Sequence, residues 1–241
     1  MRIQYLGHSA FLITASTGEK LLFDPFITPN DLAKDKIALQ DLKPDYIFLS
    51  HAHFDHIADA EAISKATGAP IIGVWEIHTY FSELGCSTYP MNVGGTWRSP
   101  RSNDMLTVKL VPAIHTSSFP DGRYGGTPVG FVISNGRYNV YYAGDTALSL
   151  EMELIAERYA LDLAILPIGG TFTMDTEDAV EAALLLDVEH VIGMHYDTFP
   201  PIKIDHAKAK QDFKDNDCEL HLLGIGEEIE LEKLIKESDG E

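Results

Sequence analysis

The sequence predicts an α/β fold in which stacked β-sheets are covered by helices. The first part of the chain is dominated by short apolar, strand-like runs, whereas helical and strand-like segments alternate from residue 148 onwards. In addition, a polar cluster at residues 51–56 directly follows an apolar run, as is typical of a strand end in an open α/β sheet. We expect a single domain that spans residues 1–241.

In the first part of the chain, strands are more frequent than helices. Apolar and β-branched runs predict strands at residues 2–6, 10–14, 20–23, 45–50 and 70–74. The first two strands flank a tight turn at residues 7–9, and a second turn at residues 17–19 precedes the third strand. Helices are expected at residues 57–67 and 76–84, each ended by a glycine.

The second part of the chain begins with strands and continues with alternating helices and strands. The predicted strands are residues 106–114, 128–134, 138–142, 161–168, 190–194, 219–223 and 228–231. The predicted helices are residues 148–159, 176–186 and 204–214. Stretches rich in proline and glycine at residues 90–100 and 119–128 are interpreted as loops, and the charged tail 233–241 is expected to fray.

Composition and charge exclude several classes of protein. With 45% hydrophobic and 23% charged residues, the composition is that of a globular protein. The net charge is −19 and the 18 Lys and Arg residues are scattered, so nucleic acid is not an expected partner. We recognise neither a signal peptide nor a membrane span, and therefore expect a cytoplasmic protein without membrane contact. A small-molecule substrate is the expected partner, and the sequence is also compatible with a homo-oligomer.

The densest cluster of chemically active residues lies at residues 51–56. It contains His51, His53, Asp55 and His56 in the pattern His-x-His-x-Asp-His, directly after the predicted strand 45–50. Imidazole and carboxylate side chains together suit zinc, iron or manganese. The cluster therefore predicts a metal site at the end of a buried strand.

Further candidate ligands also follow predicted strands directly. They are His115, Asp145 and His195. Together with the cluster they make seven donors, more than the three protein ligands of a usual catalytic zinc ion. Seven donors fit two metals that share a carboxylate and a hydroxide.

These residues, in this order, resemble the metallo-β-lactamase superfamily. The resemblance implies a four-layer αββα sandwich, with two mixed β-sheets flanked by helices and the metals at one edge. The ligands that it assigns to the first metal are His51, His53 and His115, and those that it assigns to the second are Asp55, His56 and His195. Asp145 would bridge both metals, and Asp24 would support the metal loop without touching metal.

The chain is more specifically similar to the metal-dependent hydrolase branch that includes ascorbate-phosphate lactonase-like proteins. Residues 7–11, 169–174 and 195–200 look like loops of that branch, in which Asn is expected more often where Asp197 stands. Asp145 occupies a position where true β-lactamases have Cys. The segment between Asp145 and the last histidine is also too short for the domain inserted in RNA-cleaving relatives. Antibiotic hydrolysis and RNA cleavage are therefore not expected.

Other residues are candidates for substrate contact. His8 is predicted to be catalytic, as a group that hydrogen-bonds substrate or a metal ligand, and a structural turn histidine is the alternative. The residues expected to line the substrate pocket, with core packing as the alternative for each, are Phe172, Met174, Tyr196 and Phe199. The histidines that fit no pattern are His78, His190, His206 and His221, which we interpret as surface or core residues.

The predicted activity is hydrolysis of an ester-like bond in a small cytoplasmic metabolite. A hydroxide that bridges two divalent metals would be the nucleophile, because metal binding lowers the pKa of water toward about 7. Asp55 would ligate metal and orient this hydroxide. The sequence is compatible with lactones, phosphoesters and thioesters as substrates. The resemblance alone favours lactones or phosphoesters. Zinc is favoured, and manganese and iron also fit.

Two other classes of function share the same ligand set. An iron-dependent redox enzyme would use these donors to oxidise a small sulfur compound or to reduce oxygen. A non-catalytic metal-binding protein would hold metal tightly without turning over any ester. The complete set of seven candidate ligands argues against the second of these alternatives.

Overall fold

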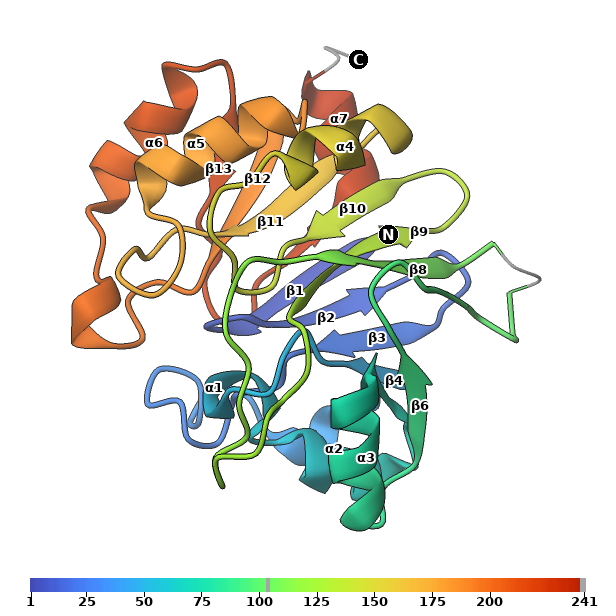
Figure 1. The fold of residues 1–241 in the computed structure, drawn as a ribbon. Coiled ribbons are helices and arrows are strands. Elements are labelled where there is room, and N and C mark those ends of the chain that lie inside the picture. Colours follow the sequence, from blue (N-terminus) through green and yellow to red (C-terminus); the bar gives the residue numbers. More distant parts are fainter. Residues whose placement is uncertain (103–104, 239–241) are drawn as a thin grey trace.

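Two seven-stranded mixed β-sheets form the centre of the computed structural model, which describes residues 1–102 and 105–238 (Figure 1). In spatial order the first sheet consists of β14 (Glu228–Glu230), β1 (Arg2–Gly7), β2 (Ala10–Thr14), β3 (Lys20–Phe23), β4 (Tyr46–Phe48), β5 (Ile71–Val74) and β6 (Thr88–Met91). The second sheet consists of β13 (Glu219–His221), β12 (His190–Met194), β11 (Leu163–Pro167), β10 (Asn139–Tyr142), β9 (Val129–Ser134), β8 (Thr107–Pro112) and β7 (Thr96–Arg98).

Helices lie outside the two sheets and complete the four layers (Figure 1). Those on the side of the first sheet are α1 (Phe54–Ile57), α2 (Ala60–Thr67) and α3 (Trp75–Glu83). Those on the side of the second sheet are α4 (Glu151–Arg158), α5 (Thr176–Leu185) and α6 (His206–Lys214), while α7 (Leu231–Ser238) follows β14. No helix in the described ranges combines the length and apolar character needed to cross a membrane. The αββα sandwich confirms the predicted fold class.

Aromatic rings fill the space between the two sheets. Phe23 and Phe48 of the first sheet stack with ring centroids 5.3 Å apart. From the second sheet, Phe131 packs edge-on against both, and the Tyr142 ring lies 5.2 Å from that of Phe23. All four side chains are fully buried. Since aromatic side chains each bury a large apolar area, this cluster joins the sheets just behind the loops that carry the candidate ligands.

The strands that precede the candidate ligands end at one edge of the sandwich. Both β8 and β10 pair antiparallel with β9 and so run in the same direction, and β10, β11 and β12 are parallel. In the first sheet, β3 and β4 are parallel, and β1 runs the same way because β2 is antiparallel to both β1 and β3. The candidate ligands therefore come from both sheets, because β4 belongs to the first sheet and β8, β10 and β12 belong to the second.

Two strands occupy parts of the segment around residues 90–100, which the sequence predicted to be a loop. They are β6 and β7, and each is the last strand of its sheet. Proline is tolerated on an edge strand because one side of the strand needs no hydrogen-bonding partner. Pro90 in β6 pairs with Gly73 of β5 on the inner side. The proline that suggested a loop is therefore compatible with an edge strand.

Two helical segments also differ from expectation. The helix predicted at residues 57–67 begins only at Ala60, as α2, and the short helix α1 precedes it. Between the two helices, the Asp59 carboxylate accepts hydrogen bonds from the backbone N–H groups of Ile27 and Thr28, at 2.6 and 2.9 Å. This contact with a distant loop has no local sequence signal. The tail expected to fray is helical in α7 up to Ser238, and its last three residues, 239–241, lie outside the described residues.

Candidate metal centre

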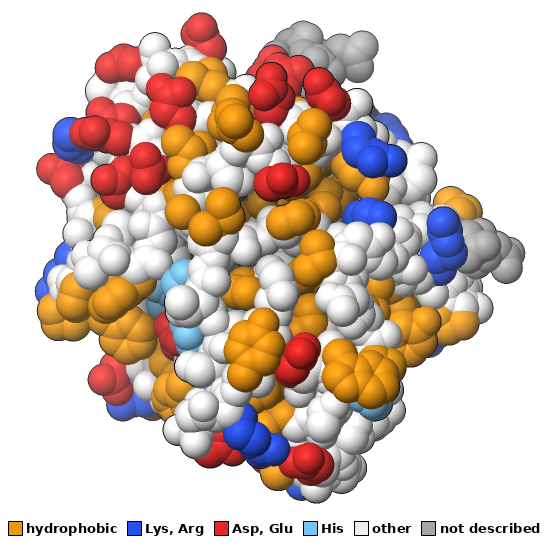
Figure 2. Space-filling model, in the orientation of Figure 1, with side chains coloured by type: hydrophobic (Ala, Val, Ile, Leu, Met, Phe, Trp, Pro, Cys, Tyr) orange, Lys and Arg blue, Asp and Glu red, His pale blue; other side chains and the backbone are white. Residues whose placement is uncertain are grey.

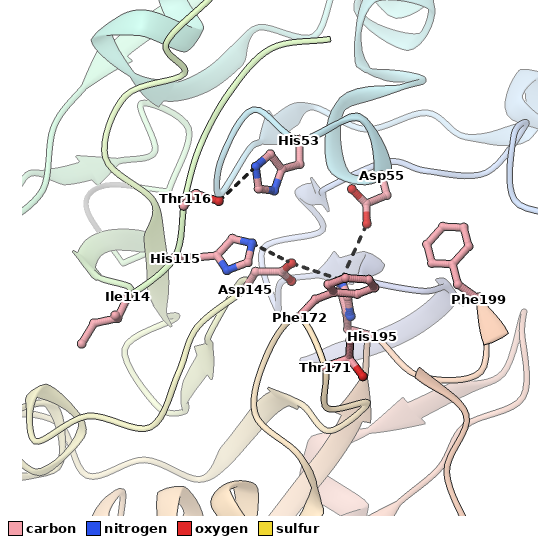
Figure 3. Close-up of a pocket in the computed structure, with 10 residues that line it drawn as sticks. All are labelled: His53, Asp55, Ile114, His115, Thr116, Asp145, Thr171, Phe172, His195 and Phe199. Atoms are coloured by element: carbon pink, nitrogen blue, oxygen red, sulfur yellow. Dashed lines mark hydrogen bonds and ion pairs between the residues drawn. The ribbon is translucent and has the colours of Figure 1, made fainter. Parts of the chain in front are cut away.

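A cavity of about 730 Å³ opens at the edge where these strands end (Figure 3). The residues that line it are His53, Asp55, Ile114, His115, Thr116, Asp145, Thr171, Phe172, His195 and Phe199. In the space-filling view, histidine side chains are visible in a hollow with hydrophobic side chains on one flank (Figure 2). Residues far apart in the sequence, from both sheets, therefore converge on one pocket.

Three histidines provide a first group of donor atoms. One ring nitrogen each from His51, His53 and His115 lies within 4.8 Å of the others. His51 Nε2 is 3.0 Å from His53 Nδ1, and the rings of His51 and His115 have centroids 5.1 Å apart. Nitrogen ligands at 2.0–2.1 Å from a tetrahedral zinc ion lie about 3.3 Å from one another. The group therefore has the dimensions of a metal site.

A second group lies beside the first. It contains Asp55, His56 and His195, the three residues predicted for a second metal, and also includes His8. Asp55 Oδ2 is 3.6 Å from His195 Nε2 and 4.0 Å from His56 Nε2. Burial alone would raise the pKa of Asp55, but the ion pair with His195 and the hydrogen bond from His8 outweigh burial and lower it. Asp55 is thus an ionised carboxylate at the cavity wall.

Asp145 lies between the two groups. Its Oδ2 atom is 3.1 Å from His195 Nε2, 3.3 Å from His56 Nε2, 3.5 Å from His115 Nε2 and 3.9 Å from His51 Nε2. Burial would raise the pKa of this carboxyl, but the neighbouring His195 and His56 hold it well below its ordinary range. One anionic oxygen is therefore shared by both groups, as the role of a bridging ligand requires.

Asp24 anchors the metal loop from behind. The carboxylate is fully buried and accepts hydrogen bonds from the Ser50 backbone N–H at 2.8 Å, the Ser50 hydroxyl, His56 Nδ1 at 2.8 Å and the Tyr142 hydroxyl at 2.7 Å. The Ser50 hydroxyl in turn accepts from His51 Nδ1 at 2.9 Å. These contacts fix the rings of His51 and His56 so that Nε2 of each faces the centre. Hydrogen bonding of this kind orients the histidine ligands of metal sites.

The donor set fits two divalent metal ions. In the part of the chain that the structure describes, His56 Nε2 and Asp145 Oδ1 are buried at the centre without a hydrogen-bond partner. Buried polar atoms are rarely left unsatisfied, and a cation would satisfy both. Imidazole and carboxylate donors in two adjoining groups around a shared oxygen match the chemistry of a dinuclear site.

His8 lies behind Asp55 and is almost fully buried. Its Nε2 is 3.0 Å from Asp55 Oδ2 and its Nδ1 is 2.9 Å from the Thr198 hydroxyl. Burial, followed by repulsion from His195, lowers the pKa of His8 to about 4, so the ring is neutral. Because Asp55 is ionised, Nε2 carries the proton and its N–H donates a hydrogen bond to Asp55, while Nδ1 accepts one from the Thr198 hydroxyl. His8 therefore contacts a candidate ligand rather than the cavity.

The four residues expected to contact substrate occupy two different environments. Phe172 and Phe199 line the cavity, and Phe172 is 54% exposed. In contrast, Met174 and Tyr196 are buried in the hydrophobic core and are not among the lining residues. The expectation is therefore corrected for these two, because their loops turn them inward and Tyr196 packs against the ring of His206.

Several residues at the centre were not singled out from the sequence. The additional cavity residues are Ile114, Thr116 and Thr171, and those with hydrogen-bonding roles are Ser50, Tyr142 and Thr198. Ser50 and Ile114 directly precede predicted ligands, so adjacency was an available signal. Tyr142 reaches Asp24 across the sandwich, and no local pattern indicates such a contact.

The backbone at this edge adopts left-handed conformations at non-glycine residues. The φ values are 55° at His8, 41° at Asp24, 58° at Thr171, 56° at His195 and 61° at Asp197. Asp and His tolerate this region better than most residues, whereas a β-branched threonine rarely enters it. The backbone N–H of His195 donates to His8 O at 3.0 Å and that of Asp24 to Phe48 O at 3.1 Å. Backbone strain is thus concentrated at the candidate centre.

We expect the two groups to differ in how their metal binding depends on pH. In the metal-free protein, burial lowers the pKa of His51, His53 and His115 below the usual 6.5, so these rings are neutral at pH 7.5. Burial would also lower the pKa of His195, but Asp145 outweighs it and raises the pKa to about 9, and the pKa of His56 is likewise raised. Since metal requires neutral imidazole, the second group must release protons on binding.

Calorimetric titration of the metal-free protein with zinc at pH 7.5, in buffers of different ionisation enthalpy, measures this difference. The expected result is little proton release for one zinc ion and at least one proton released for the other. Between pH 6.5 and 9, the affinity for the proton-releasing ion should rise with pH. Equal proton release at both sites would contradict the assignment.

The fold and the site together define a protein of the metallo-β-lactamase fold. The metallo-β-lactamase fold protein YhfI from Bacillus subtilis shares this architecture, with a TM-score of 0.73 over 95% of this chain and 98% of that chain, at 18% identity. The family model described as the Beta-lactamase superfamily domain matches residues 2–195. The chain belongs to this superfamily and, within it, to the UPF0173 family of proteins that are named metal-dependent hydrolases.

Two relatives support this membership over nearly the whole chain. The UPF0173 metal-dependent hydrolase of Christiangramia forsetii is 50% identical over 231 residues, which cover 96% of this chain and all of the relative. Among solved structures, Igni18, a metallo hydrolase from the hyperthermophilic archaeon Ignicoccus hospitalis, is 38% identical with a TM-score of 0.85 and covers 95% of this chain and 97% of that chain. The resemblance to a metal-dependent hydrolase branch of the superfamily is thereby confirmed.

Proposed function

We propose that this protein is a dinuclear metal-dependent hydrolase that cleaves an ester-like bond in a small cytoplasmic metabolite. The observation that carries the proposal is the convergence of four histidine Nε2 atoms on one Asp145 oxygen at the floor of a cavity. When bound, two divalent ions, zinc by preference, would supply a hydroxide near neutral pH and polarise the carbonyl or phosphoryl oxygen of the substrate. Membership of the UPF0173 family supports the same reaction class.

The residues around the centre have distinct tasks in this scheme. Asp55 lines the cavity as an ionised carboxylate, so it can accept a hydrogen bond from the attacking oxygen and orient it. His8 donates to Asp55 from behind and is itself fixed by Thr198, which makes His8 a positioning residue. Asp24, through His56 and Ser50, holds the metal loop in place.

The cavity wall favours an uncharged substrate with an apolar portion. Phe172, Phe199 and Ile114 line it, and Ile114 and Phe172 are each 54% exposed. The other lining side chains are imidazole, carboxylate and hydroxyl groups. Such a wall offers apolar contact and hydrogen bonds, whereas a phosphate group usually meets Arg or Lys. We therefore rank lactones and thioesters above phosphoesters as substrates.

The direct test compares the protein with its His53→Ala variant on lactone, thioester and phosphodiester panels, with metal content measured on the same samples. His53 is in the first donor group, so we expect the variant to lose one metal ion per chain and nearly all activity. The matched control is His78→Ala, which removes a half-buried histidine that forms a hydrogen bond with the Thr88 hydroxyl. Full metal content and activity in His53→Ala would refute the proposal. Oxygen uptake by the iron-loaded protein without hydrolysis would instead favour the redox alternative.

We expect Phe172→Ala to weaken substrate binding without affecting metal. The exposed ring at the cavity wall has apolar surface to bury against substrate, and losing such a contact costs about 1–3 kcal/mol. KM for an apolar lactone or thioester should rise about 10-fold, while metal content stays constant. Leu184→Ala on α5, which also removes an exposed hydrophobic side chain, serves as the control. An unchanged KM across the panel would show that Phe172 does not contact substrate.

A further inference from the structure

We propose that His190, Glu219 and His221 form an additional divalent metal site, separate from the centre at the edge of the sandwich. One donor atom from each residue lies within 4.8 Å of the others. His190 is at the start of β12, whereas His195 follows the end of that strand. At about 3.3 Å per residue, five residues of strand separate the two places by about 16 Å. The proposal goes beyond the hydrolytic function and does not depend on it.

Strand pairing brings these three side chains together. β12 and β13 are parallel, with His190 opposite Glu219 and Ile192 opposite His221. Successive side chains of a strand alternate between the two faces, so Glu219 and His221 emerge on the same face, next to His190. Two imidazoles and a carboxylate on one face of a strand pair are thus fixed by the backbone rather than by flexible loops.

The spacing of the donor atoms agrees with metal coordination. His190 Nδ1 is 3.3 Å from His221 Nε2 and 3.7 Å from Glu219 Oε2. Ligands of a tetrahedral zinc ion lie about 3.3 Å apart, so only small side-chain adjustments are needed. Glu219 is exposed to solvent, whereas His190 is buried. Two histidines and one carboxylate are also a common ligand set for zinc and other divalent transition metals.

The surroundings allow an ion to enter and the imidazoles to bind it. A cavity of about 630 Å³ opens beside His190 and Glu219. The positive charges of Lys210 and Lys214 at its wall repel a cation. Glu189 and Asp217 also line the cavity, and their negative charges offset those of the two lysines. An ion here would link β13, the edge strand of the second sheet at the end opposite β7, to β12.

A hydrogen bond between the two histidines, without metal, is the competing explanation. Zinc stoichiometry distinguishes the two, measured by equilibrium dialysis of the full-length metal-free protein against low-micromolar free zinc. We expect His221→Ala to bind one zinc ion fewer per chain than the wild type, with unchanged hydrolytic activity. Glu219→Gln, an exposed and conservative change, should lower the affinity for that one ion at least 10-fold while the fold stays intact. His206→Ala, which removes an exposed histidine on the neighbouring helix, should bind as much zinc as the wild type.

The outcome is independent of the hydrolytic centre. If that centre held no metal, the wild type would still bind one ion and His221→Ala none. Equal stoichiometry in the wild type, His221→Ala and Glu219→Gln would overturn the additional site and leave the hydrolase proposal untouched. Loss of one ion in His206→Ala as well would show that zinc binds adventitiously to surface histidines, and would also overturn it.

Discussion

Replacing Asp145 by asparagine is expected to reduce kcat/KM by about 10³-fold or more and to lower the metal content of the dinuclear centre from two ions to one or none. The Oδ2 atom of Asp145 lies within 3.9 Å of four histidine nitrogens. An amide cannot neutralise two cations, so the ions would repel each other across the shared position. The side chain keeps its size, and the fold should be retained. Elemental analysis and circular dichroism on the same sample separate loss of metal from loss of structure.

The matched control for this prediction is Asp197→Asn. Asp197 is also a carboxylate at this edge of the sandwich, but it bonds the backbone N–H of Ile204 and the ring of His206 rather than the donor groups. The same loss of charge at this position should leave metal content unchanged and activity within a few-fold of the wild type. If Asp145→Asn behaved like this control, the bridging role of Asp145 would have to be abandoned.

Asp24→Asn is expected to have the second-largest effect, because it acts on stability and on metal affinity together. The Asp24 carboxylate accepts four hydrogen bonds in a fully buried position, three of them at Oδ2. Whichever way the amide of asparagine turns, its NH₂ group faces at least one of these donors. We expect a loss of about 3–5 kcal/mol in the free energy of unfolding, the usual cost of breaking a buried charged network. Zinc affinity should fall about 10–100-fold, since His56 and Ser50 lose their support.

Urea unfolding of the metal-free protein and competition with a zinc-binding dye measure these two effects. Tyr142→Phe removes one of the four donors and should cost less, about 1–2 kcal/mol, which gives a graded series. Asp41→Ala, at an exposed carboxylate, is the control for loss of charge and should change neither quantity. A wild-type zinc affinity in Asp24→Asn would indicate that Asp24 stabilises the fold without supporting the metal loop.

The candidate ligands could be predicted from the sequence because strand ends and chemistry coincide in this fold. His51, His115, Asp145 and His195 each follow a strand-like run, and the loops after parallel strands of a sandwich open at the same edge. The pattern at residues 51–56 then indicated metal, and the structure brings all seven predicted donors together. The assignment of each donor to a particular metal remains a prediction that the proposed variants test.

Other features of the molecule depend on contacts that leave no local signal. The separation of α1 from α2 follows from Asp59 bonding a loop more than thirty residues away in the sequence. Phe172 and Met174 lie in the same loop and are both apolar, yet one lines the cavity and the other is core. The pairing of β12 with β13, which aligns His190 with Glu219, likewise becomes apparent only in the folded chain.

The left-handed backbone at His8, Asp24 and His195 limits which replacements can be interpreted, and which ones evolution can sample. A change to a β-branched residue at His195 would remove an imidazole and also force an unfavourable φ of 56°, so a loss of activity would have two causes. Asparagine and glycine accept this conformation and isolate the chemical contribution. Saturation mutagenesis at these three positions should therefore recover stable, folded variants mainly as Asn, Asp or Gly, whatever those variants catalyse.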